Sequence, residues 1–189
     1  MDELEVLRSL RLKGRAGTAD IAEASGVDEA SAEDMLARVA GQGLASHRTG
    51  KRGGWMLTAD GRSEVTARLV AERDTVDSGP AAAAYDGEFL ALNQEFKQLC
   101  TRLQIAPSDD ITAELAGIHH RADALLRRLA DAVPRYERYR SRLNAAYTRF
   151  CQGDGSALLQ PLSASYHDIW LELHEDLLLL LNRVRHEDD

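Results

Sequence analysis

Long apolar runs and cysteines are scarce in this chain of 189 residues. The longest apolar run, Leu177–Leu181, is far shorter than the roughly 20 apolar residues that a membrane-spanning helix needs. The two cysteines, Cys100 and Cys151, have neither CxxC nor metal-ligand spacing, which excludes a disulfide scaffold and a zinc ribbon. The acidic start MDELEVL is unlike the basic start of a signal or transit peptide. We therefore expect a soluble cytoplasmic protein without a membrane partner.

Motifs of the common enzyme classes are also missing. The chain contains no GxSxG, no P-loop, no GxGxxG after an expected strand and no HExxH. Its acidic residues are dispersed along expected helices, which is typical of solvated faces rather than of a paired acid and base. The sequence thus predicts neither an enzyme nor a bound cofactor.

The hydrophobic pattern changes at one segment that contains glycine and proline. Residues 75–84, TVDSGPAAAA, include Pro80, which cannot continue a preceding helix. We interpret this segment as a linker between a domain at 1–74 and a domain at 85–189. The net charge of −8 is divided unevenly: the first 73 residues hold 11 basic and 12 acidic residues, and the others hold 12 and 19. An acidic total does not exclude nucleic-acid binding, because a local basic patch is what meets the phosphates.

Short helices followed by a hairpin are expected in residues 1–74. Apolar residues recur every three or four positions in three segments bounded by glycines, which predicts three helices. Asp28 and Thr58 are positioned to cap the third helix and a fourth one. Two half-apolar runs, LASHR and WMLT, flank the basic loop TGKRGG and predict a β-hairpin with an exposed tip. Helix, helix, turn, helix and hairpin is the order of a winged helix–turn–helix.

The segment SGVDEASAEDMLARVAGQGLASHRTGKRGGWMLTADGR resembles bacterial winged-helix regulators of the MarR and GntR-like type. Three features carry the resemblance. Gly26 lies in the turn, Gly43 and Leu44 lead into the first wing strand, and WMLTADGR is similar to the family's Leu-Thr-x-x-Gly-Arg segment. The resemblance covers about residues 1–73 and implies a dimeric DNA-binding regulator.

Family geometry implies that the third helix enters the major groove and that the wing contacts the DNA backbone. Carried over by position, the residues implied to contact DNA are Ser31, Arg38, His47, Arg48, Thr49, Lys51 and Arg52. No acidic residue lies between Leu44 and Leu57, so every charged side chain of the wing is basic. The third helix instead carries Glu29, Glu33 and Asp34. These acids support an alternative, a protein-interaction module that docks a basic partner and does not bind DNA.

The domain at 85–189 carries four apolar stripes with spacings of four and three residues. They run from Tyr85 to Leu103, from Ile111 to Leu129, from Tyr136 to Phe150 and from Leu162 to Val184. The last stripe is wider than one face of a surface helix, so we expect homodimerisation through this helix. A second basic stretch is expected to pair at the surface with the acidic residues of this last helix, with a bound anion as the alternative. It consists of Arg127, Arg128, Arg135, Arg138, Arg140 and Arg142. The expected fold is mainly α: a winged helix–turn–helix with a two-stranded wing, followed by a four-helix antiparallel bundle.

Aromatic and histidine side chains of the last helix suggest a pocket for a small-molecule effector, with ordinary core packing as the alternative. The candidate residues are Tyr166, His167, Trp170 and His174. A third hypothesis is a ligand or metal sensor that acts through the bundle. We expect no bound metal, because histidines that cap helices or lie at the surface are commoner than histidines that bind a metal ion. The weak metal candidates, drawn from two helices, are His119, His120, Asp123, His167 and His174.

Overall fold

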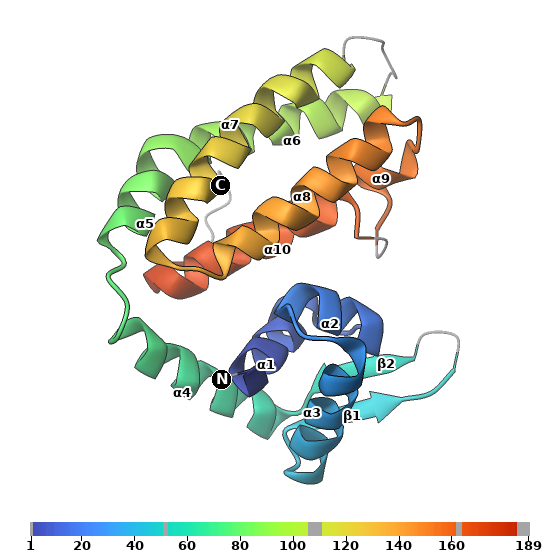
Figure 1. Ribbon diagram of the computed structural model, residues 1–189, viewed down its shortest axis with the longest axis vertical. Helices are drawn as coiled ribbons and strands as arrows, with labels where there is room; N and C mark the ends of the chain where they lie inside the picture. The colour runs from blue at the N-terminus through green and yellow to red at the C-terminus, as the bar shows by residue number, and fades with distance from the viewer. Residues whose placement is uncertain (1, 51–52, 106–110, 162–163, 185–189) are drawn as a thin grey trace. The chain divides into compact units, whose positions relative to one another are not determined.

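A computed structural model describes residues 2–50, 53–105, 111–161 and 164–184. Over these ranges the protein is mainly helical, with one two-stranded antiparallel sheet (Figure 1). The predicted mainly helical class with a two-stranded hairpin is therefore confirmed. The chain forms two compact units, Met1–Thr75 and Val76–Asp189. Among the described residues, no helix combines the length and apolar character that crossing a bilayer requires.

The first unit is built from short amphipathic helices and a hairpin. Its elements are α1 (Asp2–Lys13), α2 (Thr18–Ser25), α3 (Glu29–Gly41), β1 (Ala45–Arg48), β2 (Gly54–Leu57) and α4 (Ala59–Arg73). Apolar residues three or four positions apart on these helices meet in one core, which includes Val6, Leu7, Leu10, Ile21, Leu36, Val39, Val65 and Leu69. Each such side chain contributes about 1.5–3 kcal/mol when it leaves water.

Capping residues determine where the helices of this unit begin. The side chain of Asp28 accepts a hydrogen bond from the backbone N–H of Ser31 at 2.9 Å, and Thr58 accepts one from Gly61 at 3.0 Å. The predicted caps of the third and fourth helices are confirmed. Gly26, at φ 76°, ends α2 in the left-handed conformation and turns the chain into α3.

The hairpin is tied to the start of the unit through its second strand. β1 pairs with β2 in antiparallel register, with Ala45 opposite Leu57 and Arg48 opposite Gly54. On the other side of β2, the N–H of Trp55 donates to the carbonyl of Ala16 at 2.8 Å, and the N–H of Ala16 donates back at 3.2 Å. Strand β2 is thus held on both edges, whereas β1 is largely exposed.

The junction between the hairpin and α4 explains the Leu-Thr-x-x-Gly-Arg pattern physically. The hydroxyl of Thr58 donates to the carbonyl of Gly43 at 2.7 Å, and its N–H donates to the carbonyl of Leu44 at 3.0 Å. Helix α4 then passes so close to Leu44 that a β-carbon at Gly61 would lie 1.8 Å from the Leu44 carbonyl oxygen. Only glycine fits there without a shift of the backbone.

Most of the second unit consists of longer helices. Its elements are α5 (Gly79–Ala84), the π-helical turn η1 (Tyr85–Phe89), α6 (Leu90–Ile105), α7 (Ile111–Ala132), α8 (Tyr136–Cys151), α9 (Ser156–Leu159) and α10 (Tyr166–Leu181). The structure differs from the linker expected at 75–84, because α5 is helical and Ala81 is fully buried in this unit's core. Pro80 starts a helix here, a position where its missing N–H is not needed, and alanines favour its continuation.

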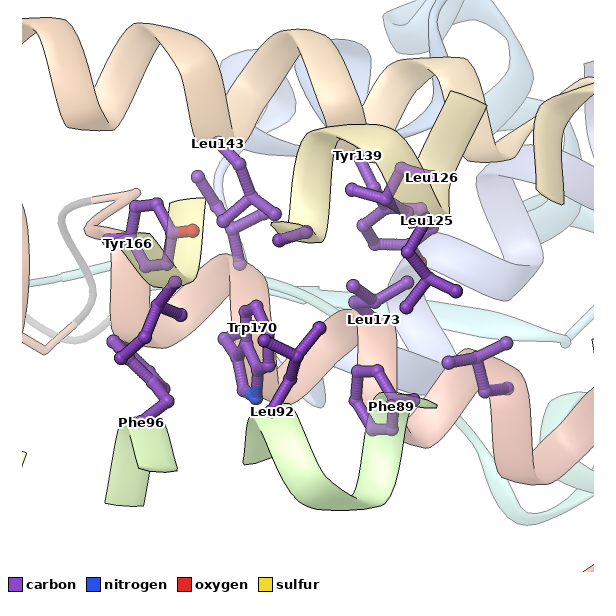
Figure 2. Packing of buried hydrophobic residues seen from close by; sticks show 14 of the residues in the cluster. Phe89, Leu92, Phe96, Leu125, Leu126, Tyr139, Leu143, Tyr166, Trp170 and Leu173 are labelled. Carbon is purple, nitrogen blue, oxygen red and sulfur yellow. The ribbon is translucent and has the colours of Figure 1, made fainter. Parts of the chain in front are cut away.

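Helix α10 contributes many of the buried residues of the second unit's core. It packs against α8, and α8 in turn packs against α7 and α7 against α6. Trp170 and Tyr166 of α10 meet Phe89 and Phe96 across the core (Figure 2). Part of the surplus apolar surface that suggested a dimer helix is therefore buried within this unit, as Trp170 and Leu178 illustrate, whereas Leu171 is exposed.

Arg135 and Arg142 pair with acidic residues of α10, as expected, but these pairs lie inside the core and not at the surface. Arg135 Nε lies 3.0 Å from Asp176 Oδ2, and Arg142 Nη1 lies 2.8 Å from Glu172 Oε2. All four side chains are less than a tenth exposed. Burial and the nearby carboxylates raise the pKa of Tyr139, which lies beside them. These charges are far costlier to unpair than surface charges.

Candidate functional site

The tip of the hairpin presents its polar side chains to solvent. His47, Arg48 and Thr49 are all exposed, while the predicted contacts Lys51 and Arg52 lie outside the described residues. The imidazole of His47 rests on the indole of Trp55, with ring centroids 4.7 Å apart. This contact fixes the outward face of β1 relative to the better-anchored β2.

Close backbone turns shape the hairpin tip. The N–H of Gly53 donates to the carbonyl of Gly50 at 2.8 Å, and Gly50 has φ 106°. A β-carbon at Gly53 would lie 2.7 Å from the carbonyl oxygen of Arg48. The glycines of the TGKRGG loop are therefore needed for the turn, independently of any ligand that the loop binds.

The two side chains of α3 that were predicted to reach DNA differ in exposure, because Ser31 is half-buried and Arg38 is exposed. The hydroxyl of Ser31 donates to Asp28 Oδ2 at 2.6 Å, so its proton is already used in the helix cap. Arg38 is 59% exposed, and its Nη1 lies 3.9 Å from Glu3 Oε2. Because Glu3 also binds Arg68 at 2.8 Å, Arg38 is held only weakly. Arg38 is thus the more available of the two for an anion.

The same helix carries the exposed carboxylates Glu29, Glu33 and Asp34. Only Glu33 is anchored by a hydrogen bond within the described chain: it accepts from the Thr18 hydroxyl at 2.8 Å. Thr18 in turn accepts from the indole N–H of Trp55 at 3.2 Å. This chain of bonds joins β2, α2 and α3, so one of the three acids has a structural role.

Arg62 is a further cation near the hairpin that the sequence interpretation left out of the DNA-contact set. It is exposed in the first turn of α4, and its Nη1 donates to the carbonyl of Leu57 at 3.1 Å. That bond holds the guanidinium at the base of the hairpin and leaves other donors available. Its place in the Leu-Thr-x-x-Gly-Arg segment was the signal that could have identified it.

A second candidate site is a cavity of about 290 Å³ in the second unit. It is lined by one face of α6 and one face of α10. The lining residues recur every three or four positions: Asn93, Phe96, Lys97, Cys100, Thr101 and Gln104 from α6, and His167, Trp170, Leu171 and His174 from α10. Three of the four residues predicted for an effector pocket thus meet at this cavity.

Tyr166 is the predicted pocket residue that the structure does not bring to the cavity. It is fully buried, and its hydroxyl lies 3.3 Å from Nδ1 of His119. The sequence interpretation also missed the whole contribution of α6. A polar residue in the middle of an apolar stripe, Asn93 beside Leu92 and Phe96, was the signal that could have pointed to it.

Polar groups of this cavity differ in how firmly they are held. The indole N–H of Trp170 donates to Asn93 Oδ1 at 2.9 Å, and Nε2 of His174 lies 3.0 Å from the Tyr85 hydroxyl. Burial raises the pKa of the Cys100 thiol to about 12, so this thiol is neutral and unreactive. The inner wall is therefore polar but uncharged at Asn93 and Cys100.

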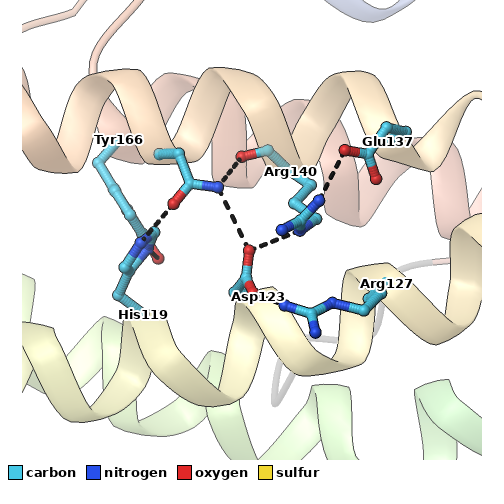
Figure 3. Close-up of polar contacts among 7 residues, drawn as sticks. His119, Asp123, Arg127, Glu137, Arg140 and Tyr166 are labelled. Carbon is cyan, nitrogen blue, oxygen red and sulfur yellow. Dashed lines mark hydrogen bonds and ion pairs between the residues drawn. The ribbon is translucent and has the colours of Figure 1, made fainter.

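The structure does not bring the weak metal candidates together. Both ring nitrogens of His119 are engaged, Nε2 with Asn144 Oδ1 at 3.0 Å and Nδ1 with Tyr166 (Figure 3). Burial lowers the pKa of His119, with the Asn144 bond partly offsetting it. Asp123 binds Arg127 and Arg140 instead of an ion.

Among the described residues, no three His, Cys, Asp or Glu side chains are grouped to hold a metal. His120 is exposed, and His167 and His174 lie on a different helix at the cavity. The site residues therefore form two groups, one at α3 and the hairpin and one at the α6–α10 cavity. Comparisons of the chain with protein-family models, with curated proteins and with solved structures gave no match.

Proposed function

We propose that the protein is a transcriptional regulator that binds double-stranded DNA as a homodimer, through a winged helix–turn–helix in its first unit. The observation that carries the proposal is the basic, exposed tip of a hairpin that directly follows two helices joined by a tight turn. In a winged helix–turn–helix the second of these helices, here α3, enters the major groove, and the hairpin contacts the backbone. The second unit then supplies a helical bundle for dimerisation.

Phosphate contact by the hairpin dominates binding in this proposal. His47, Arg48 and Thr49 are exposed along β1, and the loop that follows contains two further cations, Lys51 and Arg52. Each phosphate neutralised releases counterions, so binding is strongest at low salt. Arg38 and the cation of Arg62 at the hairpin base extend the basic surface beyond the tip.

The acids of α3 limit what the helix contributes to base recognition. Carboxylates are repelled by phosphates, and of the base edges in the major groove only the cytosine amino group suits them well. We therefore assign specificity mainly to Ser31, which keeps an acceptor oxygen, and to Arg38 at the far end of the helix. Affinity comes from the hairpin.

The test is fluorescence anisotropy with the DNA upstream of the protein's own gene, titrated against a shuffled duplex at several salt concentrations. We expect preferential, salt-sensitive binding. The triple variant R48A/K51A/R52A should lose most of the affinity, and the slope of log K against log salt should fall by about 0.9 for each lost phosphate contact. Unchanged affinity in this variant would contradict the role of the hairpin.

A matched control removes three exposed arginines from the second unit. R102A/R127A/R128A changes the net charge by the same amount, and its side chains make only exposed ion pairs of small energetic value. This variant should bind DNA with nearly the affinity and salt slope of the unchanged protein. Equal losses in both triple variants would mean that net charge alone, and not the hairpin, determines binding.

The acidic face of α3 favours one alternative, a module that docks a basic protein partner. Glu29, Glu33 and Asp34 are exposed, and no ion pair involves them within the described chain. Under this alternative the anisotropy titrations show no binding to either duplex. A partner recovered at one-to-one stoichiometry, and insensitive to nuclease, would then replace the regulator proposal.

A further inference from the structure

The side-chain amide of Asn144 on α8 can face its neighbours in one orientation only. Its Nδ2 lies 3.0 Å from the carbonyl oxygen of Arg140 and 3.3 Å from Asp123 Oδ1. Against the effect of burial, hydrogen bonds from Asn144 and two arginines lower the pKa of Asp123, so this carboxyl group is ionised at neutral pH. A carboxylate and a backbone carbonyl only accept hydrogen bonds, so the NH2 group must point at them and Oδ1 must face His119.

This orientation determines which ring nitrogen of His119 carries the proton. Asn144 Oδ1 lies 3.0 Å from Nε2 of His119, and an amide oxygen requires a donor, so Nε2 is protonated (Figure 3). In the neutral ring Nδ1 is then an acceptor, and the Tyr166 hydroxyl donates to it at 3.3 Å. The neutral imidazole therefore links α8 to the first residue of α10, with a donor facing an acceptor at each step.

Protonation of the ring breaks this pattern. A proton from solvent can add only at Nδ1, which then becomes a donor, so the Tyr166 oxygen has to accept and its own O–H loses its acceptor. Tyr166 is 0% exposed, and its hydroxyl has no second hydrogen-bond partner within the described residues. A buried donor without an acceptor is costly, so the charged ring favours displacement of Tyr166.

The charged and titratable groups around His119 do not reverse this preference. Burial, the largest effect, lowers the pKa of His119, although the Asn144 bond and Asp123 oppose it. Two arginines bind Asp123 and weaken its attraction for a proton on the ring. Burial also raises the pKa of Tyr166 and of Cys100, so neither supplies a negative charge. The groups of the surrounding network are Asp123, His120 and Arg127 of α7, Glu137, Arg140, Tyr147 and Cys151 of α8, Tyr166 of α10 and Cys100 of α6.

We propose that His119 is an acid-sensitive connection between the start of α10 and the α7–α8 pair. The neutral ring holds Tyr166 in place, and a proton at Nδ1 releases it. The next turn of α10 carries His167 and Trp170 on the wall of the α6–α10 cavity, so the same step loosens this wall. The proposal rests on the second unit alone and does not depend on DNA binding by the first.

Proton linkage gives the direction of the pH effect. The unfolded chain takes up a proton at His119 near the ordinary value of 6.5, whereas the folded chain does so only at lower pH. The stabilising contribution of the neutral ring is therefore complete above pH 6.5. It is lost progressively as the pH falls below this value.

Urea unfolding of the full chain between about pH 5.5 and 7.5 tests the proposal, with Trp170 fluorescence in a W55F background as the signal. The variant H119Q keeps an amide that can donate to Asn144 or accept from Tyr166, and it cannot take up a proton. We expect the urea midpoint to fall with pH in the unchanged second unit and to fall much less in H119Q. The control H120Q, which removes the exposed neighbouring histidine, should keep the full effect.

The variant Y166F separates proton sensing from a structural role. It removes the O–H that protonation would leave without an acceptor, so the pH dependence should weaken although His119 is kept. A merely structural role of Tyr166 would lower the urea midpoint equally at every pH. In NMR titrations the His119 ring should titrate below pH 6.5 in the unchanged protein and at higher pH in Y166F. The indole N–H signal of Trp170 should shift with the His119 midpoint.

Three results would overturn the proposal: a His119 ring that titrates at or above pH 6.5, an H119Q variant with the pH dependence of the unchanged protein, or a Trp170 signal that does not follow the titration. If H119Q does not fold, the titration of the unchanged protein and of Y166F decides the question. An identical His119 midpoint in those two proteins would contradict the role of the Tyr166 hydroxyl.

Discussion

The backbone of α4 approaches the end of the hairpin so closely at Gly61 that no other residue fits. A β-carbon there would lie 1.8 Å from the carbonyl oxygen of Leu44, which already accepts the N–H of Thr58. Replacing Gly61 with alanine would push α4 away from the hairpin and strain both. Overpacking of this kind costs typically about 1–3 kcal/mol, and we expect G61A to lie at the upper end.

Urea unfolding of G61A measures this cost. The chain has two tryptophans, Trp55 in the first unit and Trp170 in the second, so a W170F background reports on the first unit alone. The control is G41A in α3, where a β-carbon would meet nothing within 4 Å. Equal stability of G61A and G41A would show that the junction can relax without cost.

Residue chemistry that depends on local spacing could be predicted from the sequence. Asp28 and Thr58 were identifiable as caps because the hydrogen bond spans only three residues. The Trp170–Asn93 bond was not predictable, because its partners are 77 positions apart and meet only when α6 and α10 pack in one register. For the same reason the α6 half of the cavity was missed.

At the scale of whole elements, the apolar periodicity predicted the helices well. The role of glycine and proline at the ends of helices was predicted poorly. Apolar spacings of three and four identified α6, α7, α8 and α10 because burial of one face dictates them. The Gly-Pro pair that begins α5 was interpreted as part of a linker, although proline also begins helices. The wide apolar stripe on α10 is used only in part by the core, which buries Trp170 and Leu178 and leaves Leu171 exposed. Which part is buried depends on how the helices pack, not on the helix itself.

The contact between α8 and α10 depends on two buried ion pairs, and this leads to a stability prediction. R142M takes away a buried cationic partner of Glu172, and breaking a buried ion pair costs about 3 kcal/mol or more. Replacing both residues, in R142M/E172L, should recover most of that loss, since apolar replacements of buried pairs are often neutral. Trp170 fluorescence during urea unfolding, in a W55F background, reads the second unit.

The exposed pair of Arg121 and Glu95 on α7 and α6 provides the control for this measurement. Both side chains are nearly half exposed, so R121M should change the stability by less than about 1 kcal/mol. A loss in R142M no larger than that in R121M would mean that the buried pair is solvated in solution.

For the whole molecule, the proposed function requires two copies on one DNA site. A dimeric helix–turn–helix protein reads two half-sites about one helical turn apart, so binding should saturate at two chains per duplex. Sedimentation equilibrium of the free protein should give twice the 20.8 kDa of one chain.

The inner face of α10 is used in the core, so a dimer surface must involve apolar groups that stay exposed, such as Ile105, Leu171 and Val184. The variant L171E should then lower the association constant without unfolding the second unit, because Leu171 is 41% exposed. A monomer in solution that saturates DNA at one chain per duplex would refute the dimeric part of the proposal and leave the hairpin contacts to be judged by their own variants.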